Sequence, residues 1–454
     1  MKMNSPTAFA TPHASCAKVA RPRRRQILAG AIAALLGCAA GAEAAVQYWD
    51  VNGAAAGFGG TGNWDLTTPN WNTATGTAAP AGWANLADSD AVFQGTPGAV
   101  TLSVANVQAR NLTFNVTGYT VAGTLAAPLN LRLGSIISVQ NVADSATISA
   151  PIVTTAGFDK QGAGTLVLSG ANTYSGQTSV SAGTLKAGAA AAFSATSNYF
   201  VSGTLDLGGF SNSIGSISGL AGGFVKNNGA AAAALTTGAN NLDATFQGVI
   251  SDGPGGVSAL GITKVGTGRQ TFSGANTYSG DTLLQAGSLF SDVDPAVGTN
   301  SAFGTGTLVI SGGTTLGSTL NGEVIPNGIK VLGNFTLAAG QPATNNIILK
   351  GNIDLTGSVR EISGSTPNGQ LNLLGAISNG GVTLTHTGAS GYSSFIYGNN
   401  DALNDTANSY TGLTTLNANT FLVLNKNAGA GADAAVKGDV LVNQGGSVNY
   451  FLPD

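Results

Sequence analysis

The octapeptide "SGANTYSG" occurs twice, at Ser169–Gly176 and at Ser273–Gly280. It lies inside a longer repeat, because Phe158–Lys186 and Ile262–Phe290 are related by a constant offset of 104 residues without a gap. A more divergent copy, "ANSYTGLTTLNANTF", runs over Ala407–Phe421. Sequence that returns in this way is typical of proteins built from stacked structural repeats.

Each copy alternates apolar side chains with turn residues. In the first copy, Leu166 and Leu168 share one face of a short strand, Thr178 and Val180 share a face of the next, and Leu185 belongs to a third. Strands of this length bury little alone, but stacked coils join them into one continuous core. The sequence therefore predicts an all-β fold, a right-handed parallel β-helix (β-solenoid). "SGAN" would form its corners, with Gly and Asn at positive φ.

The corner positions recur in all three copies, and we expect their role to be structural. A β-sandwich would also contain short strands and glycine turns, but it would not predict identical corners at a fixed offset. The corner residues are Gly170, Asn172, Tyr174 and Gly176 in the first copy, Gly274, Asn276, Tyr278 and Gly280 in the second, and Asn408, Tyr410 and Gly412 in the third.

The first 44 residues differ from the rest of the chain. The basic cluster Arg21–Arg25 precedes the apolar run Ile27–Ala40, and Ala42-Glu43-Ala44 matches an A-x-A cleavage site. This order predicts a secretory signal peptide over residues 1–44, because the apolar run is too short to span a bilayer. Two variants stay open. Arg24-Arg25 resembles part of a twin-arginine signal, and Leu35–Cys38 resembles a lipoprotein box that would leave Cys38 lipidated.

Composition restricts what the chain after Ala45 can bind. Both cysteines, Cys16 and Cys38, precede Ala45, so a chain cleaved there has no thiol for a disulfide or a zinc site. Six of the 18 basic residues and one of the 21 acidic residues also precede Ala45, and the remainder is acidic. We therefore expect no binding to nucleic acid.

Residues 45–150 are predicted to form a β-rich region that caps the solenoid of residues 151–454. Capping coils cover the open end of a stacked core and are atypical in sequence. A second interpretation stays open, in which indole rings of this region stack on sugar rings of a carbohydrate. The residues concerned are the four tryptophans of the chain, Trp49, Trp64, Trp71 and Trp83.

The pattern K-x-G-x-G-T-L-x-L-S-G-A-N-T-Y-S-G-x-T-x-V-x-x-G-T-L at Lys160–Leu185 resembles the autotransporter-associated β-strand repeat, also called the passenger-associated transport repeat. The second copy departs from it at Arg269-Gln270, where Thr-Leu is expected. Linking segments such as "YWDVNG" and "GDVLVNQGGSVNY" are also similar to those of the family, so the resemblance extends over most of Tyr48–Tyr450.

The resemblance implies an exported, surface-directed β-helix of a Gram-negative bacterium. Its repeats would help the passenger cross the outer membrane by progressive folding outside, with the outer-membrane export machinery as partner. Surface glycans or other cells are expected as ligands of an adhesive or structural protein. A barrel of alternating strands about ten residues long is typical of autotransporters. Because Asp454 closely follows a repeat-like stretch, we expect either a barrel outside this sequence or another export route.

The residue types needed for catalysis or for holding a cofactor or metal do not cluster in the sequence. His386 is the only histidine after Ala45, no Ser or Asp spacing places it in a triad, and G-x-S-x-G is absent. We therefore predict no enzymatic activity; the alternative is a polysaccharide-binding or polysaccharide-degrading protein on the same scaffold. The charged residues weighed for such a site are the pairs Asp88/Asp90 and Asp401/Asp405 and the dispersed Arg110, Arg132, Arg269 and Arg360.

Overall fold

The computed structural model describes residues 45–53, 55–256, 258–293, 301–338, 346–398, 407–425 and 436–450. The chain divides into two units, Met1–Ala42 and Glu43–Asp454, and the fold described here is that of the second. The predicted signal peptide, with Cys38 and the cleavage site, lies outside the described residues, as do Asp401 and Asp405.

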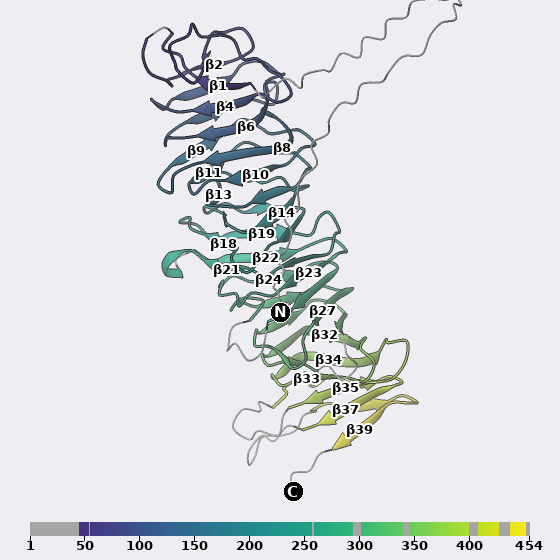
Figure 1. The fold of residues 1–454 in the computed structure, drawn as a ribbon. Helices are drawn as coiled ribbons and strands as arrows, with labels where there is room; N and C mark the ends of the chain where they lie inside the picture. The colour runs from purple at the N-terminus through teal and green to yellow at the C-terminus, as the bar shows by residue number, and fades with distance from the viewer. Residues whose placement is uncertain are drawn as a thin grey trace, which may run out of the picture. The chain divides into compact units, whose positions relative to one another are not determined.

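Four sheets of stacked strands form this unit (Figure 1). The first sheet has the order β17 (Ser216–Ser218), β14 (Asn198–Val201), β12 (Thr178–Val180), β10 (Phe158–Gln161), β8 (Asn130–Val139), β6 (Gln108–Phe114), β4 (Asp90–Phe93), β1 (Val46–Trp49) and β3 (Trp71–Asn72). The second has the order β2 (Gly62–Trp64), β5 (Ala99–Leu102), β7 (Thr120–Ala122), β9 (Ser145–Ile148), β11 (Thr165–Leu168), β13 (Thr184–Ala187), β15 (Thr204–Asp206), β18 (Phe224–Asn227) and β21 (Val249–Asp252).

Later coils build the other two sheets. The third has the order β16 (Asn212–Ser213), β19 (Ala233–Thr237), β22 (Leu260–Lys264), β24 (Thr282–Leu284), β26 (Leu308–Ile310), β29 (Ile329–Val331), β32 (Ile353–Gly364), β30 (Phe335–Ala338), β27 (Thr314–Ser318), β25 (Ser288–Ser291), β23 (Arg269–Phe272) and β20 (Ala244–Phe246). A branch of this sheet continues from β32 to β34 (Ile377–His386), then to β36 (Thr414–Leu416) and β38 (Val440–Val442). The fourth contains β28 (Glu323–Ile325), β31 (Asn346–Leu349), β33 (Gly369–Leu373), β35 (Ser393–Tyr397), β37 (Thr420–Leu424) and β39 (Ser447–Tyr450).

Strands from successive coils pair in parallel and in register, which confirms the predicted parallel β-solenoid. Leu166 of β11 pairs with Leu185 of β13, which in turn pairs with Leu205 of β15. All three leucines are fully buried, as are Thr178 and Val180 on the neighbouring sheet. Side chains that point inward from each coil therefore lie directly above one another and form the single core column that the alternation predicted.

Exceptions to this pattern are few within the described ranges. One antiparallel ladder joins β1 to β3, and one 3-10 turn, η1 (Pro254–Gly256), interrupts the strands. The alanine run at residues 230–234 ends within β19 and forms no helix. The described part of the chain also has no helix of the length and hydrophobicity needed to cross a membrane.

The sheets run without a break across residue 150, where the predicted capping region ends. β4, β6 and β8 already pair in parallel, and their sheet continues into β10 without a break. The second sheet likewise passes from β9 to β11 across residue 150. The first coil differs from the later ones in its antiparallel β1–β3 ladder.

The long strands β8 and β32 each contain a bulge. β8 shifts register against β6 between Ala109 and Asn111, and β32 shifts against β34 between Asp354 and Ser358. Such bulges bend the strand locally and redirect its side chains. Each of the two bulges lines a groove on the solenoid surface.

Candidate functional site

The corner asparagine of each repeat links successive coils. The Oδ1 atom of Asn172 accepts a hydrogen bond from the Ile152 amide at 2.8 Å, and its Nδ2 atom donates to the Ala192 carbonyl at 2.6 Å. One partner lies in the preceding coil and the other in the next. Asn172 is 6% exposed, so both bonds are shielded from water. A single amide thus satisfies two buried backbone groups at the point where the chain turns.

The second copy repeats both bonds, and the third copy repeats the bond accepted from the preceding coil. Asn276 accepts from the Ile250 amide at 2.7 Å and donates to the Ala302 carbonyl at 2.6 Å. Asn408 accepts from the Ile377 amide at 2.8 Å. Asparagine suits this position because one side chain carries an acceptor and a donor.

The corner tyrosine of each copy points into the core and bonds to the threonine four residues later. The phenolic oxygen and the threonine Oγ1 are 3.0 Å apart for Tyr174 and Thr178, 2.5 Å for Tyr278 and Thr282, and 2.8 Å for Tyr410 and Thr414. Burial raises the pKa of all three tyrosines, that of Tyr174 to about 12. The pattern Y-x-G-x-T is therefore a buried hydroxyl pair that joins the corner to the following strand.

The corner glycines have a different role from the one expected. Positive φ was predicted for the corner Gly and Asn residues, but none of them has a φ in the left-handed region. The glycines are needed because the backbone of the preceding coil lies against them. A Cβ atom at Gly176 would overlap the amide of Gly157, and one at Gly280 or Gly412 would overlap a carbonyl of the coil before. A turn with positive φ does occur later in the repeat, at Gly183 and Gly287.

A buried lysine completes the geometry of the first two repeats. The Lys160 ammonium donates to the carbonyls of Gln161 at 2.8 Å, Gly162 at 2.9 Å and Ala182 at 3.1 Å. Gly162 has a φ of +74°, and the last carbonyl belongs to the next coil. Lys264 makes the equivalent three bonds, to Val265, Gly266 and Ala286.

Both ammonium groups reside in an environment that disfavours charge. Lys160 is 0% exposed and Lys264 is 1% exposed. Burial lowers the pKa of each to about 8, while Asp159 and Asp243, respectively, act in the opposite direction. Three carbonyl acceptors favour the protonated amine, which is how a cation can be retained in the interior.

These lysines were not predicted from the sequence as site residues. A signal was present, because both stand two residues after an inward-facing apolar position, Phe158 or Ile262, on the same face of the strand.

The four tryptophans pack in the core of the first coils. Trp49, Trp64 and Trp71 are 0% exposed, Trp83 is 3% exposed, and ring centroids of neighbouring indoles lie 4.4–5.2 Å apart. Stacking on a sugar needs an accessible ring face, which these indoles do not offer. Their packing matches the capping interpretation, in which large side chains fill the end of the column.

His386 lies next to a serine but has no acidic partner among its bonds. Its Nδ1 atom is 2.8 Å from the Ser393 hydroxyl, and its Nε2 atom is 3.2 Å from the Ser390 carbonyl. Ser393 is 1% exposed, so a substrate cannot reach its oxygen. A Ser-His-Asp triad instead requires an accessible hydroxyl and a carboxylate on the second ring nitrogen. Within the described ranges, no three His, Cys, Asp or Glu residues gather as potential metal ligands.

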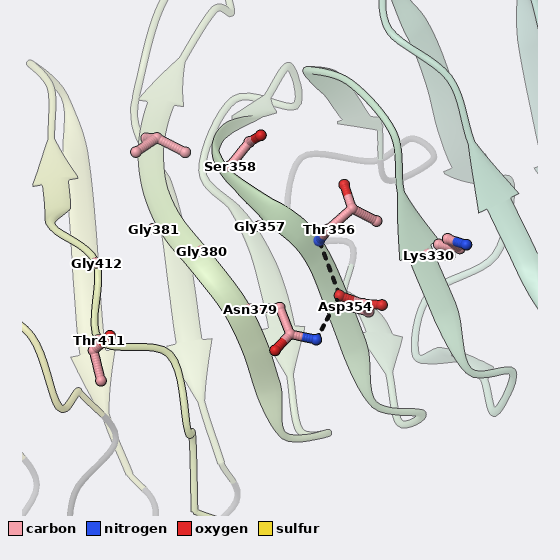
Figure 2. Close-up of a pocket in the computed structure, with 11 residues that line it drawn as sticks. Lys330, Asp354, Thr356, Gly357, Ser358, Asn379, Gly380, Gly381, Thr411 and Gly412 are labelled. Carbon is pink, nitrogen blue, oxygen red and sulfur yellow. Dashed lines mark hydrogen bonds between the residues drawn. The ribbon is translucent and has the colours of Figure 1, made fainter.

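A polar groove of about 740 Å³ lies beside the third repeat copy, where β32 bulges (Figure 2). Asp354 accepts hydrogen bonds from the Thr356 amide at 2.9 Å and from Asn379 Nδ2 at 3.0 Å. These bonds, with the nearby Lys330, lower the pKa of Asp354. Both donors bind the Oδ1 atom of Asp354, and the β32 groove is lined by hydroxyl and backbone groups together with Lys330 and this carboxylate.

Two comparisons with known proteins bear on this geometry. The passenger-associated transport repeat family matches residues 158–187 and 262–289, the two copies that have the asparagine bridge, the tyrosine–threonine pair and the buried lysine. This chain carries passenger-associated transport repeats. The third copy repeats the bond from Asn408 to the preceding coil and the hydroxyl pair, without a lysine at the equivalent place.

A curated relative of the chain is described as an adhesin BmaC autotransporter, from Brucella suis biovar 1 (strain 1330). The two sequences are 31% identical over 382 residues, which is 79% of this chain and 10% of the relative. This chain thus spans about a tenth of the length of that protein. No solved structure matches the chain.

Proposed function

We propose that this chain is an exported surface passenger whose transport repeats help it fold as it leaves the outer membrane, and that its role is adhesive and non-enzymatic. The observation that carries the proposal is the asparagine bridge of the repeats. In the first two repeats, each bridge has one partner in the preceding coil and one in the following coil, so an emerging coil finds its bonds on the coil already formed.

Progressive folding of this kind would give export a direction. Stacked repeats contact only their neighbours, so folding can propagate from one coil to the next. The buried lysine adds a second link, because its third carbonyl becomes available only when the next coil is in place. Each completed coil would oppose backward movement of the chain, and the outer-membrane export machinery would be the partner in this process.

The adhesive role is supported by the relative described as an adhesin and by the surface of the solenoid. Repeated strands with a low charge content present a long, regular face to other cells or to surface glycans. The alternative of a polysaccharide-degrading enzyme has less support, because His386 and Ser393 form a pair that is closed to substrate.

Surface display in a Gram-negative host tests the proposal. The chain would be produced with a translocator barrel, and its accessibility to protease would be measured on intact cells. The wild type would be compared with a double variant, Asn172→Ala with Asn276→Ala. Asn228→Ala is the control, because the Asn228 side chain is exposed. We expect the double variant to reach the surface less and to accumulate in the periplasm, with Asn228→Ala unaffected. Equal display of all three would contradict a role for the bridges in export. Failure of displaying cells to adhere to any host cell would contradict the adhesive role.

A further inference from the structure

Arg110 and Arg132 lie side by side on consecutive coils of the structure. Arg110 follows Ala109 on β6, Arg132 follows Leu131 on β8, and Ala109 pairs with Leu131 in the register of the two strands. Both line one groove of about 710 Å³, which we call the β8 groove. In the sequence these arginines look dispersed, because a separation of 22 positions conceals that they occupy consecutive coils.

Each arginine is held in place by a residue of the preceding coil. The Nη1 atom of Arg110 lies 3.5 Å from Asp88 Oδ1, and the Nη1 atom of Arg132 donates to Gln108 Oε1 at 2.8 Å. A guanidinium group has five N–H donors in a planar fork. Each contact engages one nitrogen, so the others are available to an anion that enters the groove.

The bulge that presents Arg132 is itself well fixed. The Ser135 hydroxyl, on a residue 1% exposed, accepts from the Arg132 amide at 2.9 Å and donates to the Arg132 carbonyl at 2.6 Å. Gly134 between them has a φ of +77°, which favours glycine at this position. The bulge is therefore a built feature of the coil that directs Arg132 into the groove.

Apolar and hydrogen-bonding groups stand beside the two cations. The Leu133 side chain is 90% exposed at the tip of the bulge, and Val153, also in the groove, is 37% exposed. The Asp88 carboxylate, half exposed, can accept hydrogen bonds from hydroxyl groups. A cation pair, an apolar contact and a hydroxyl acceptor within one groove match the groups of an acidic pyranose: its carboxylate, its C–H face and its hydroxyls.

We propose that the β8 groove binds a carboxylate-bearing sugar, with the carboxylate between Arg110 and Arg132 and the ring against Leu133. The proposal rests on the adhesive function, and it names the class of ligand as a uronic acid or sialic acid residue of a surface glycan. A polyanion fits less well, because Asp88 leaves the groove with a single net positive charge on an acidic chain.

Binding of purified, exported full-length chain to defined sugars tests this inference. Isothermal titration would compare trigalacturonate and sialyllactose, which represent the two sources of the carboxylate, with the neutral maltotriose and lactose. We expect binding of at least one acidic sugar and of neither neutral one. Arg110→Gln and Arg132→Gln should each weaken it by roughly tenfold or more, as expected for loss of a hydrogen bond to a charged group. Arg132→Lys, which keeps the charge but loses the fork, should also weaken it.

Arg269→Gln is the matched control. It removes an exposed arginine outside the groove, so it should leave affinity unchanged. The proposal is overturned if neither acidic sugar binds, if the groove variants bind as tightly as the wild type, or if polyglutamate or heparin binds in preference to both sugars. Cell adhesion that persists in Arg110→Gln and Arg132→Gln would overturn this inference and leave the adhesive function standing. If displayed cells fail to adhere at all, the titration with purified chain still decides whether the groove binds sugar.

Discussion

Removing the corner asparagine of the second repeat should destabilise the solenoid far more than removing an exposed asparagine. Asn276→Ala leaves the Ile250 amide and the Ala302 carbonyl without a side-chain partner, and both residues are at most 2% exposed. An unsatisfied buried polar group costs about 1–3 kcal/mol, so we expect a loss of about 2–6 kcal/mol in the free energy of unfolding.

Two measurements on the full chain check this value. Urea unfolding followed by circular dichroism gives the change in free energy, with Asn228→Ala as the matched control that should differ from wild type by less than about 0.5 kcal/mol. Hydrogen exchange reports the site itself. A loss of 2 kcal/mol or more would speed exchange of the Ile250 amide by roughly 30-fold or more. Similar values for Asn276→Ala and Asn228→Ala would refute the argument that the amide joins the coils.

Three further predictions concern the same repeats. Gly280→Ala places a methyl group against the Leu260 carbonyl, which should cost about 1–3 kcal/mol of stability and lower the melting temperature. Gly222→Ala should leave it unchanged, because no atom lies within 4 Å of the added methyl group. Equal melting temperatures for the two variants would contradict the close contact between Gly280 and the preceding coil. In urea unfolding, Tyr174→Phe should lower the free energy of unfolding more than Tyr278→Phe. The Tyr174 hydroxyl bonds to both Thr178 and Tyr199, whereas that of Tyr278 bonds to Thr282. A larger loss for Tyr278→Phe would contradict the contribution of this hydroxyl network. The buried lysines have a pKa of about 8 in the folded chain and 10.5 in the unfolded chain. Between these pH values the unfolded state binds more protons than the folded state. The free energy of unfolding should therefore rise by about 1.4 kcal/mol per pH unit for each lysine from pH 8 to about pH 10. Above pH 10 the buried tyrosines, whose pKa is raised, make stability fall with pH. The variant with Lys160→Met and Lys264→Met should lose the rise in the urea midpoint between pH 8 and pH 10. The same dependence of the midpoint on pH in this variant and the wild type would contradict the role given to the lysines.

The fold could be predicted from sequence because its signals are local and repeated. Alternation with a period of two identifies the inward face of each strand, and identical corners at a constant offset indicate stacked coils. Leu166, Leu168 and Leu185 are buried as that pattern predicted.

The structural role of each corner residue could not be predicted from local sequence signals. Positive φ is the general local explanation for glycine and asparagine in a turn, but Gly176 and Asn172 are needed because of atoms about 20 residues away in sequence. Those contacts depend on the length of each coil, which sequence alone did not provide. Without the coil length, the proximity of Arg110 and Arg132 could not be predicted. For the same reason, the sequence could not decide whether the tryptophans pack in the core or bind sugar.

A disulfide between neighbouring coils tests the stacking most directly. Thr147 of β9 pairs with Val167 of β11, and Val167 pairs with Lys186 of β13. Adjacent strands lie about 4.8 Å apart, within the range of a disulfide, whereas strands two coils apart lie at about 9.6 Å, beyond it. We predict that the variant with Thr147→Cys and Val167→Cys oxidises to an intramolecular disulfide, detected by mass spectrometry, and that Thr147→Cys with Lys186→Cys stays reduced. A bond in the second variant, or none in the first, would contradict the solenoid register on which the repeat corners, the export role and the β8 groove all depend.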